Sequence, residues 1–262
     1  MLHVVRAKSL LTGLRPPPPS AWPKPIAPRR RWNGYFLYLP DGVLTASHLY
    51  TLDRLRALPG GLLAICATPG VEQVPEDLFR RADAVCWKGL SGYDFSAYAL
   101  ALAAVAERAP GADLFLLNDS VLGPFGDVEA LLERSSWDLT GFTASAAFEN
   151  HVQSYAFLIR NVNPAMVRAL RTVVSTRYAF NYYQNVVNWQ ETRLARVAAR
   201  SMSVGALWYS DGRNVHDPSL QSATDLVASG LPFLKRSLLG RYAGFQDRDR
   251  LEAILKAAGH PL

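Results

Sequence analysis

The sequence predicts an α/β fold in which a mainly parallel sheet is covered by helices on both faces. Strand-like and helix-like segments alternate over the first half of the chain, and this alternation is typical of parallel strands joined by helices. The chain has 262 residues, of which 49% are hydrophobic and 19% charged. That composition suffices for the core of one sizeable domain.

The first half of the chain divides into four strands separated by three helices. The strands are expected at 35–39, 62–66, 84–87 and 114–117, and the first two helices at 45–58 and 75–81. The third helix is the clearest, because apolar residues recur at spacings of three and four from Phe95 to Ala109.

The second half of the chain does not keep the strict alternation. Strands are expected at 138–142, 154–159 and 203–209, and helices at 126–134, 164–174, 183–200 and 247–258. A parallel first half with a mixed C-terminal half is a common way to build a site for two substrates.

The N-terminal residues differ from the rest in composition. Residues 1–31 contain seven prolines, seven Lys or Arg and no acid. Because proline fixes φ and lacks an amide donor, they are predicted to form a disordered tail that contacts an anionic membrane surface, before one folded domain over 32–262. That domain holds 21 basic and 22 acidic residues, and this balance speaks against a nucleic-acid partner.

Several classes of protein lack their signals here. No apolar run reaches the ~18 residues of a membrane span, and the N-terminus lacks the apolar core of a signal peptide. Cys66 and Cys86 have no metal-binding spacing and are expected to be buried thiols in a reducing compartment. The motifs of dinucleotide-binding, P-loop, zinc-protease and α/β-hydrolase sites are also absent.

Asp119 is the leading candidate site residue. It follows the apolar run 114–117 and precedes Gly123 and Pro124, so a short buried strand ends in a carboxylate. Ligands of open α/β sheets bind beyond the carboxyl ends of strands, where an acid can hold a divalent cation against a diphosphate. The structural alternative is that Asp119 caps a helix or closes a turn.

Other candidates have similar alternatives. Asp94 either caps the long helix or contacts a nucleoside. The alternation of a strand places His151 and Gln153 on one face and Ser154 on the other, and together they could bind sugar hydroxyls. Glu191 falls on an apolar helical stripe, where a carboxylate is costly unless it is paired or used. It is therefore either part of a buried ion pair or a general base.

Six segments together resemble the rhamnan synthesis protein F family of polysaccharide-building glycosyltransferases. They are similar to the family's pattern in the same order over roughly residues 32–240, namely Gly92–Phe95, Leu117–Pro124, Trp137–Gly141, His151–Tyr155, Glu191 and Gly230–Lys235. The proline-rich segment is not part of that pattern, and the residues around Glu191 match it loosely.

The resemblance implies a GT-A-like, Rossmann-like fold that transfers a sugar from a nucleoside diphosphate to a growing cell-surface glycan. It implies dTDP-rhamnose as donor and a cytoplasmic location on the inner face of a bacterial membrane. In that scheme Asp119 holds Mg²⁺ or Mn²⁺ with support from Asn118 and Ser120, Asp94 contacts the nucleoside, and Glu191 serves as the base. His151, Gln153 and Ser154 contact sugars. A non-catalytic subunit that binds sugar nucleotides or glycans is the main alternative.

Overall fold

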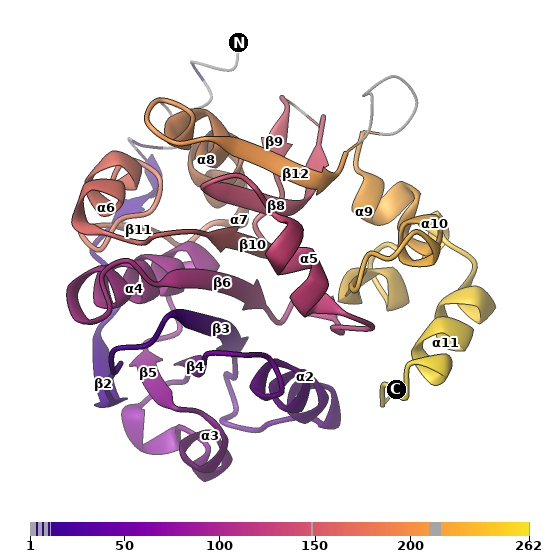
Figure 1. The fold of residues 1–262 in the computed structure, drawn as a ribbon, viewed down its shortest axis with the longest axis horizontal. Coiled ribbons are helices and arrows are strands. Elements are labelled where there is room, and N and C mark those ends of the chain that lie inside the picture. The colour runs from indigo at the N-terminus through magenta and orange to yellow at the C-terminus, as the bar shows by residue number, and fades with distance from the viewer. Residues whose placement is uncertain are drawn as a thin grey trace.

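A nine-stranded mixed sheet runs through the molecule in the order β12-β8-β10-β6-β3-β4-β5-β2, with β9 paired to β8 (Figure 1). The computed structural model describes residues 12–147, 149–209 and 216–261, together with residues 4, 7 and 10. The strands of the sheet are β2 (Ser20–Lys24), β3 (Arg31–Tyr38), β4 (Gly61–Ala67), β5 (Ala84–Lys88), β6 (Asp113–Asn118), β8 (Leu139–Ser145), β9 (His151–Val152), β10 (Ala156–Ile159) and β12 (Val204–Trp208).

The pairing of the strands confirms the predicted fold class. β3 runs parallel to β4 and β6, β4 is parallel to β5, and β12 is parallel to β8. β10 is antiparallel to both of its neighbours, β6 and β8. The result is an α/β fold with a mostly parallel sheet, as predicted. Its antiparallel strands come from the second half of the chain and, at one edge, from β2.

Helices cover both faces because successive side chains of a strand point to opposite sides. In β6, Leu114 and Leu116 belong to one buried cluster, whereas Phe115 and Leu117 belong to the other. The first cluster packs against α4 (Tyr93–Arg108), α6 (Pro164–Leu170) and α8 (Thr192–Ala198). The second packs against α2 (Ala46–Arg56), α3 (Glu76–Arg81) and α5 (Val128–Arg134).

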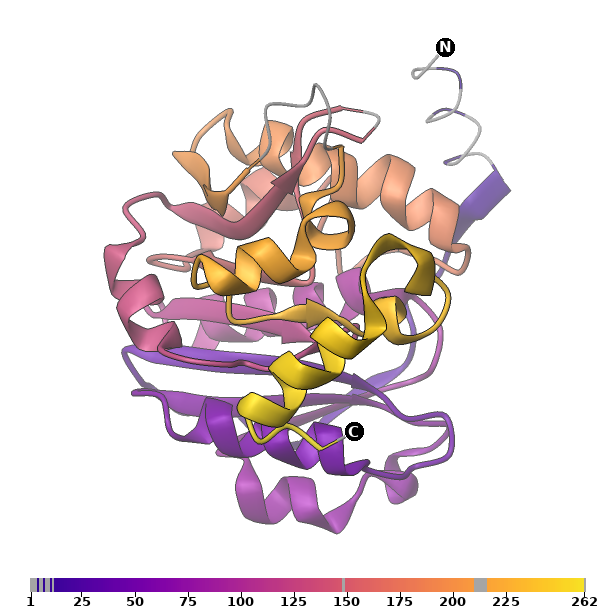
Figure 2. The ribbon, with the colours of Figure 1, turned by 90° about the vertical axis from the view of Figure 1, so that its right-hand side faces the viewer.

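A third, smaller cluster lies in the C-terminal part. It contains side chains of α11 (Arg248–Ala257) together with those of β7 (Val121–Leu122) and β13 (Leu234–Lys235), which pair antiparallel. Figures 1 and 2 show α9 (Pro218–Gln221), α10 (Ala223–Ala228) and α11 gathered at the side toward which β6 points. The C-terminal residues therefore come close to the end of β6, where Asp119 lies.

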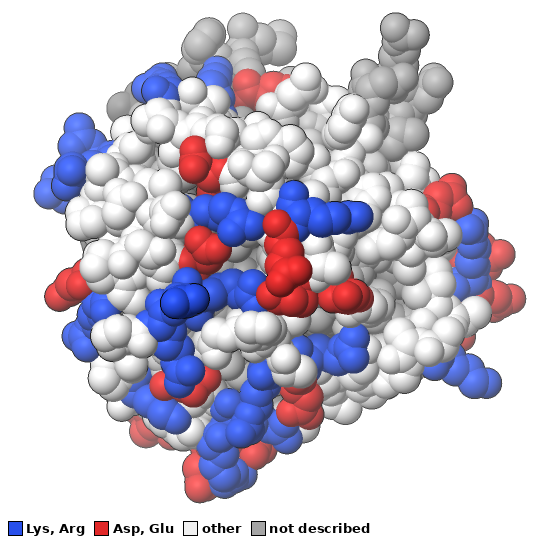
Figure 3. Space-filling model, viewed as in Figure 1, with Lys and Arg blue, Asp and Glu red and all other residues white. Residues whose placement is uncertain are grey.

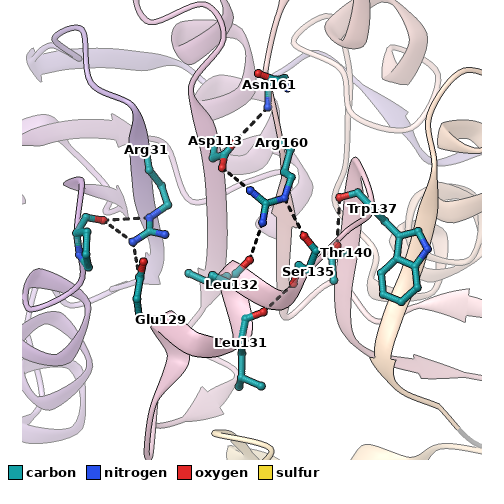
Figure 4. Close-up of polar contacts among 11 residues, drawn as sticks. Arg31, Asp113, Glu129, Leu131, Leu132, Ser135, Trp137, Thr140, Arg160 and Asn161 are labelled. Carbon is teal, nitrogen blue, oxygen red and sulfur yellow. Dashed lines mark hydrogen bonds and ion pairs between the residues drawn. The ribbon is translucent and has the colours of Figure 1, made fainter.

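At the opposite ends of β3 and β6, ion pairs anchor each strand to a neighbouring element. Arg160 Nη1 lies 2.9 Å from Asp113 Oδ2, and its other nitrogens donate to the carbonyls of Leu132 and Ser135 (Figure 4). Arg31 pairs with Glu129 of α5 in the same region. These contacts fix the amino ends of the two strands and leave the carboxyl ends for a site.

The prediction that residues 1–31 form a disordered tail is wrong for the described residues from Leu14 onward. β2 adds to the sheet antiparallel to β5, and β1 (Leu14–Arg15) pairs with β11 (Ala179–Phe180). Ile26 is 5% exposed, and Trp22 packs against the same cluster. The composition misled because an edge strand tolerates proline, whose missing N–H can face away from the sheet.

Three of the seven basic residues in this segment are bound to the domain. Lys24 Nζ donates to the carbonyls of Phe79 and Ala82, Arg29 pairs with Asp83 at 2.7 Å, and Arg31 pairs with Glu129. Arg6 and Lys8 lie outside the described residues. Acidic and basic side chains interleave on the face drawn in Figure 3. The membrane-contact prediction therefore loses much of the charge on which it rested.

In the described part, no helix is both long and apolar enough to cross a bilayer.

Beginning the chain at Trp32 is expected to destabilise the domain. The truncation removes β2 from the sheet edge and Ile26 from the core, so the free energy of unfolding should fall by at least the ~1.5–3 kcal/mol of one buried aliphatic side chain. Urea unfolding of both chains measures the difference, and a chain beginning at Thr12 separates the strand's contribution from that of the preceding residues. Equal stability of the full chain and the one from Trp32 would contradict the packing of this segment.

Candidate functional site

A cleft of about 800 Å³ opens at the carboxyl ends of the central strands. Residues at the end of β3 and after β5 and β6 line it. So do residues before β10, in the π-helical turn Val186–Glu191 (η2), and at and after the end of β13. Of the predicted site residues, the cleft contains Asp94, Asn118, Asp119, Ser120, Ser154 and Glu191. Segments separated by more than 100 residues thus meet at the position where open α/β sheets bind ligands.

Asp119 is fixed to the end of the neighbouring strand. The amide of Tyr38 donates to Asp119 Oδ2 at 2.7 Å, and the amide of Asp119 donates to the Phe36 carbonyl at 3.1 Å. Burial raises the pKa of Asp119 to about 6, against the opposing effects of the Tyr38 amide and the Arg236 guanidinium. A cation or a hydrogen-bond donor in the cleft would favour the ionised form.

The side chain of Asn118 links Ser120 to Asp94 through hydrogen bonds. Its Nδ2 donates to Asp94 Oδ2 at 2.8 Å, while its Oδ1 accepts from Ser120 N at 3.1 Å and from Ser120 Oγ at 2.5 Å. Because Asn118 is only 6% exposed, these bonds define its orientation. Asn118 and Ser120 therefore belong to one polar network in the cleft.

Asp94 lies in the first turn of α4, and the residue in the N-cap position is Gly92. Asp94 Oδ1 accepts from the Phe95 amide at 2.9 Å. Burial first, and the charge of Glu191 second, raise the pKa of Asp94 to about 6. Asp94 is therefore not the N-cap of the helix, although its side chain accepts a bond at the helix start and also lines the cleft. Its contact with a nucleoside stays a prediction.

Glu191 does not face the core as the apolar stripe predicted. The π-helical turn Val186–Glu191 changes the helical register just before α8, and such turns are frequent at functional sites. Glu191 Oε1 accepts from both Ser154 N at 3.0 Å and Ser154 Oγ at 2.9 Å. No ion pair of Glu191 occurs within the residues that the structure describes. This leaves a carboxylate oriented by Ser154 on the cleft wall.

His151 and Gln153 are not brought to the cleft. The predicted continuous strand breaks, since β9 ends at Val152 and β10 begins at Ala156. His151 Nδ1 contacts the Glu149 carbonyl at 2.8 Å, and Gln153 is bound by Thr143, Asp217 and Ser219. Of the three predicted sugar contacts, only Ser154 reaches the cleft, because it lies in the turn between the two strands.

Basic residues at the end of β13 and after it supply the cleft's positive charge, and the sequence did not reveal their role. Lys235, Arg236 and Arg241 all line the cleft. Arg236 Nε donates to the Asp119 carbonyl at 3.0 Å, and Arg236 Nη2 donates to Ser47 Oγ at 3.1 Å. The available signal was adjacency, because Arg236 directly follows the Gly230–Lys235 segment.

Lys88 is a second residue that the sequence did not single out. It is fully buried at the end of β5, and Nζ donates to the carbonyls of Gly89 at 2.9 Å and Ser91 at 2.8 Å. Burial lowers the pKa of Lys88 to about 8, while the charge of Asp94 acts in the opposite direction. Lys88 thereby fixes the turn that leads into Asp94.

No family model matches the sequence, and no curated protein matches it. The predicted resemblance to rhamnan synthesis protein F has no support at the level of a family.

Solved structures align with this chain over most of its length. A 4-diphosphocytidyl-2C-methyl-D-erythritol synthase from Anaerococcus prevotii aligns with a TM-score of 0.43 and 9% identity, over 71% of this chain and 90% of that one. HddC from Yersinia pseudotuberculosis aligns with a TM-score of 0.37 and 7% identity, over 67% and 90%. A nucleotide-diphospho-sugar transferase candidate from Desulfovibrio desulfuricans G20 aligns with a TM-score of 0.40 and 14% identity, over 89% and 97%. At these values, the case for a function rests on the side chains of this chain.

Proposed function

We propose that this chain is a glycosyltransferase that moves a sugar from a nucleoside diphosphate to a glycan acceptor. The observation that carries the proposal is the meeting, in one cleft, of Asp119 at a strand end, the cations Lys235, Arg236 and Arg241, and Glu191 oriented by Ser154. Each group matches one requirement of sugar transfer.

The first requirement is to stabilise the leaving diphosphate. Negative charge develops on it as the bond from its oxygen to the anomeric carbon breaks, and fixed cations in a partly enclosed cleft favour that charge. Arg236 is already held by the Asp119 carbonyl and Ser47 Oγ, so little reorganisation is needed when the donor binds.

The second requirement is to remove a proton from the acceptor hydroxyl. Glu191 is an acceptor-only group when ionised, and the bonds from Ser154 N and Ser154 Oγ aim its carboxylate. The hydroxyl oxygen would attack the anomeric carbon while its proton passes to Glu191, and the electron pair of the broken bond would leave with the diphosphate.

The proposed metal, Mg²⁺ or Mn²⁺, fits the cleft as an ion held jointly by Asp119 and the phosphates of the donor. The described residues contain no group of three or more His, Cys, Asp or Glu side chains placed to hold a metal. Mg²⁺ is commonly held by one or two carboxylates together with substrate phosphates and water, and Asp119 meets that pattern. When bound, the ion would supply electrostatic stabilisation of the diphosphate.

The identity of the donor sugar is the most specific part of the proposal. The segments that resemble rhamnan synthesis protein F point to dTDP-rhamnose and to assembly of a cell-surface polysaccharide. Five of the six segments contribute to the cleft, through Asp94, Asn118 to Ser120, Ser154, Glu191 and Lys235.

Calorimetric titration of the full chain with dTDP, dTMP and thymidine tests the proposal. A diphosphate should bind more tightly than the monophosphate, and Arg236→Met should weaken dTDP about 10- to 100-fold, the scale of a hydrogen bond to a charged group. Arg250→Met is the matched control, because Arg250 pairs with Asp225 on the surface. Release of dTDP from dTDP-rhamnose then measures turnover.

Two results would count against the proposal. Absence of nucleotide binding would overturn the whole site assignment. Binding of the nucleotide with no turnover of any kind, not even slow hydrolysis of the donor by water, would favour the non-catalytic binding subunit instead.

A further inference from the structure

Two exposed tyrosines in the cleft have no role in the donor scheme. Tyr93 and Tyr183 line the cleft, with 40% and 55% of their surface exposed. Their ring centroids lie 6.5 Å apart, and the ring planes are tilted by 52°. Large aromatic surfaces left open among polar groups are typical of pockets that orient a ligand.

The backbone of Tyr93 is held in an unusual conformation. Its φ is +48°, and Asn161 is the only other non-glycine residue of the described part with a positive φ. Such a conformation is uncommon for a bulky residue. It persists where the surroundings determine it, and it occurs often at functional sites.

The surroundings that hold the two tyrosines are connected. The amide of Gly92 donates to Asn181 Oδ1 at 2.9 Å, and Ser96 Oγ donates to the Tyr93 carbonyl at 2.8 Å. Asn181 precedes the short helix α7 (Tyr183–Asn185) by two residues. One hydrogen bond therefore ties the loop that carries Tyr93 to the segment that carries Tyr183.

The pair of rings adjoins the cleft's carboxylates. Burial, followed by the charges of Glu191, Tyr242 and Asp94, raises the pKa of Tyr183 to about 12. Tyr183 thus lies in the electrostatic range of Glu191 and Asp94. A ligand group placed against these rings would share the cleft with the carboxylate that would receive the acceptor's proton.

We infer that Tyr93 and Tyr183 form the acceptor subsite, which holds a pyranose ring through its C–H face and directs one hydroxyl at Glu191. A pyranose combines an apolar face, which packs on an aromatic ring, with hydroxyls at its edge that donate to carboxylates. Two rings tilted by 52° with centroids 6.5 Å apart cannot sandwich a flat nucleobase, whereas together they offer a puckered sugar one angled apolar surface. The inference rests on the proposed function, because it takes Glu191 as the base.

Variants at three neighbouring tyrosines test the subsite. Tyr183→Ala removes one ring, and Tyr93→Asn removes the other with a residue that tolerates positive φ. Tyr182→Ala is the matched control, because Tyr182 is 62% exposed and does not line the cleft. The probes are methyl α-L-rhamnopyranoside and methyl α-D-glucopyranoside, followed by saturation-transfer NMR with dTDP bound.

Glycoside binding should weaken about 5- to 10-fold in Tyr183→Ala and Tyr93→Asn, the scale of one aromatic contact. The dTDP affinity and the hydrolysis of dTDP-rhamnose by water should stay unchanged, and Tyr182→Ala should behave as the wild type. A parallel loss of dTDP affinity would overturn the inference in favour of a nucleobase site. Unchanged glycoside binding in both variants, or no glycoside signal from the dTDP-bound wild type, would also overturn it. Failure of the wild type to bind dTDP at all would instead refute the proposed function.

Discussion

Glu191→Gln is expected to lower the rate of sugar transfer about 10²–10⁴-fold, the usual contribution of a positioned general base. Glutamine keeps the shape of the side chain, and its Oε1 can still accept from Ser154 N and Oγ, as Glu191 does. It cannot take up the proton of an acceptor hydroxyl. The donor affinity and the melting temperature should therefore remain those of the wild type while kcat falls.

Steady-state kinetics with dTDP-rhamnose and a glycan acceptor measures this effect, and calorimetry checks donor binding. Glu107→Gln, on the exposed side of α4, controls for the loss of one negative charge. A fully active Glu191→Gln enzyme would remove the residue from the chemistry. A variant that unfolds would show that the bonds to Ser154 are structural.

Asp119→Asn is expected to abolish the response of donor binding to Mn²⁺. The asparagine oxygen can still accept from the Tyr38 amide, so the strand end should keep its conformation. Loss of partners outside the ligand shell already weakens metal binding about 10- to 100-fold, and loss of the carboxylate itself should cost at least as much. The measurement is the dTDP affinity in Mn²⁺ and in EDTA for the wild type and the variant.

Asp225→Asn is the control for this second variant, because Asp225 pairs with Arg250 away from the cleft. An identical Mn²⁺ response in wild type and Asp119→Asn would show that the ion is held elsewhere. Equal affinity in Mn²⁺ and EDTA for both would mean that Lys235, Arg236 and Arg241 neutralise the diphosphate without an ion.

The local sequence pattern predicted that Asp119 follows a strand and that Asp94 lies at the start of a helix. The run 114–117 forms β6, and Asp119 lies at its carboxyl end because an apolar strand followed by a turn leaves little alternative. The helix that begins near Asp94 was equally visible, since its apolar spacing extends over four turns. Both residues meet in the cleft because parallel strands end at one edge of the sheet.

Contacts between distant segments could not be predicted in this way. Arg236 reaches the Asp119 carbonyl across 117 positions of sequence, and the two-residue pairing of β13 with β7 that brings it there leaves no periodic signal. The π-helical turn that redirects Glu191 is set by packing against neighbouring elements, and a regular 3.6-residue period does not show it.

The position of β2 also bears on how the protein avoids self-association. The open edge of a parallel sheet presents unpaired N–H and C=O groups that can recruit a strand from another molecule. β2 covers that edge of β5, and it carries Pro23 and a shift of register between Ala21 and Lys24, two features that make an outer edge a poor template for further pairing. The proline-rich composition that looked like disorder thus equips the segment to end the sheet and keep the protein from polymerising through it.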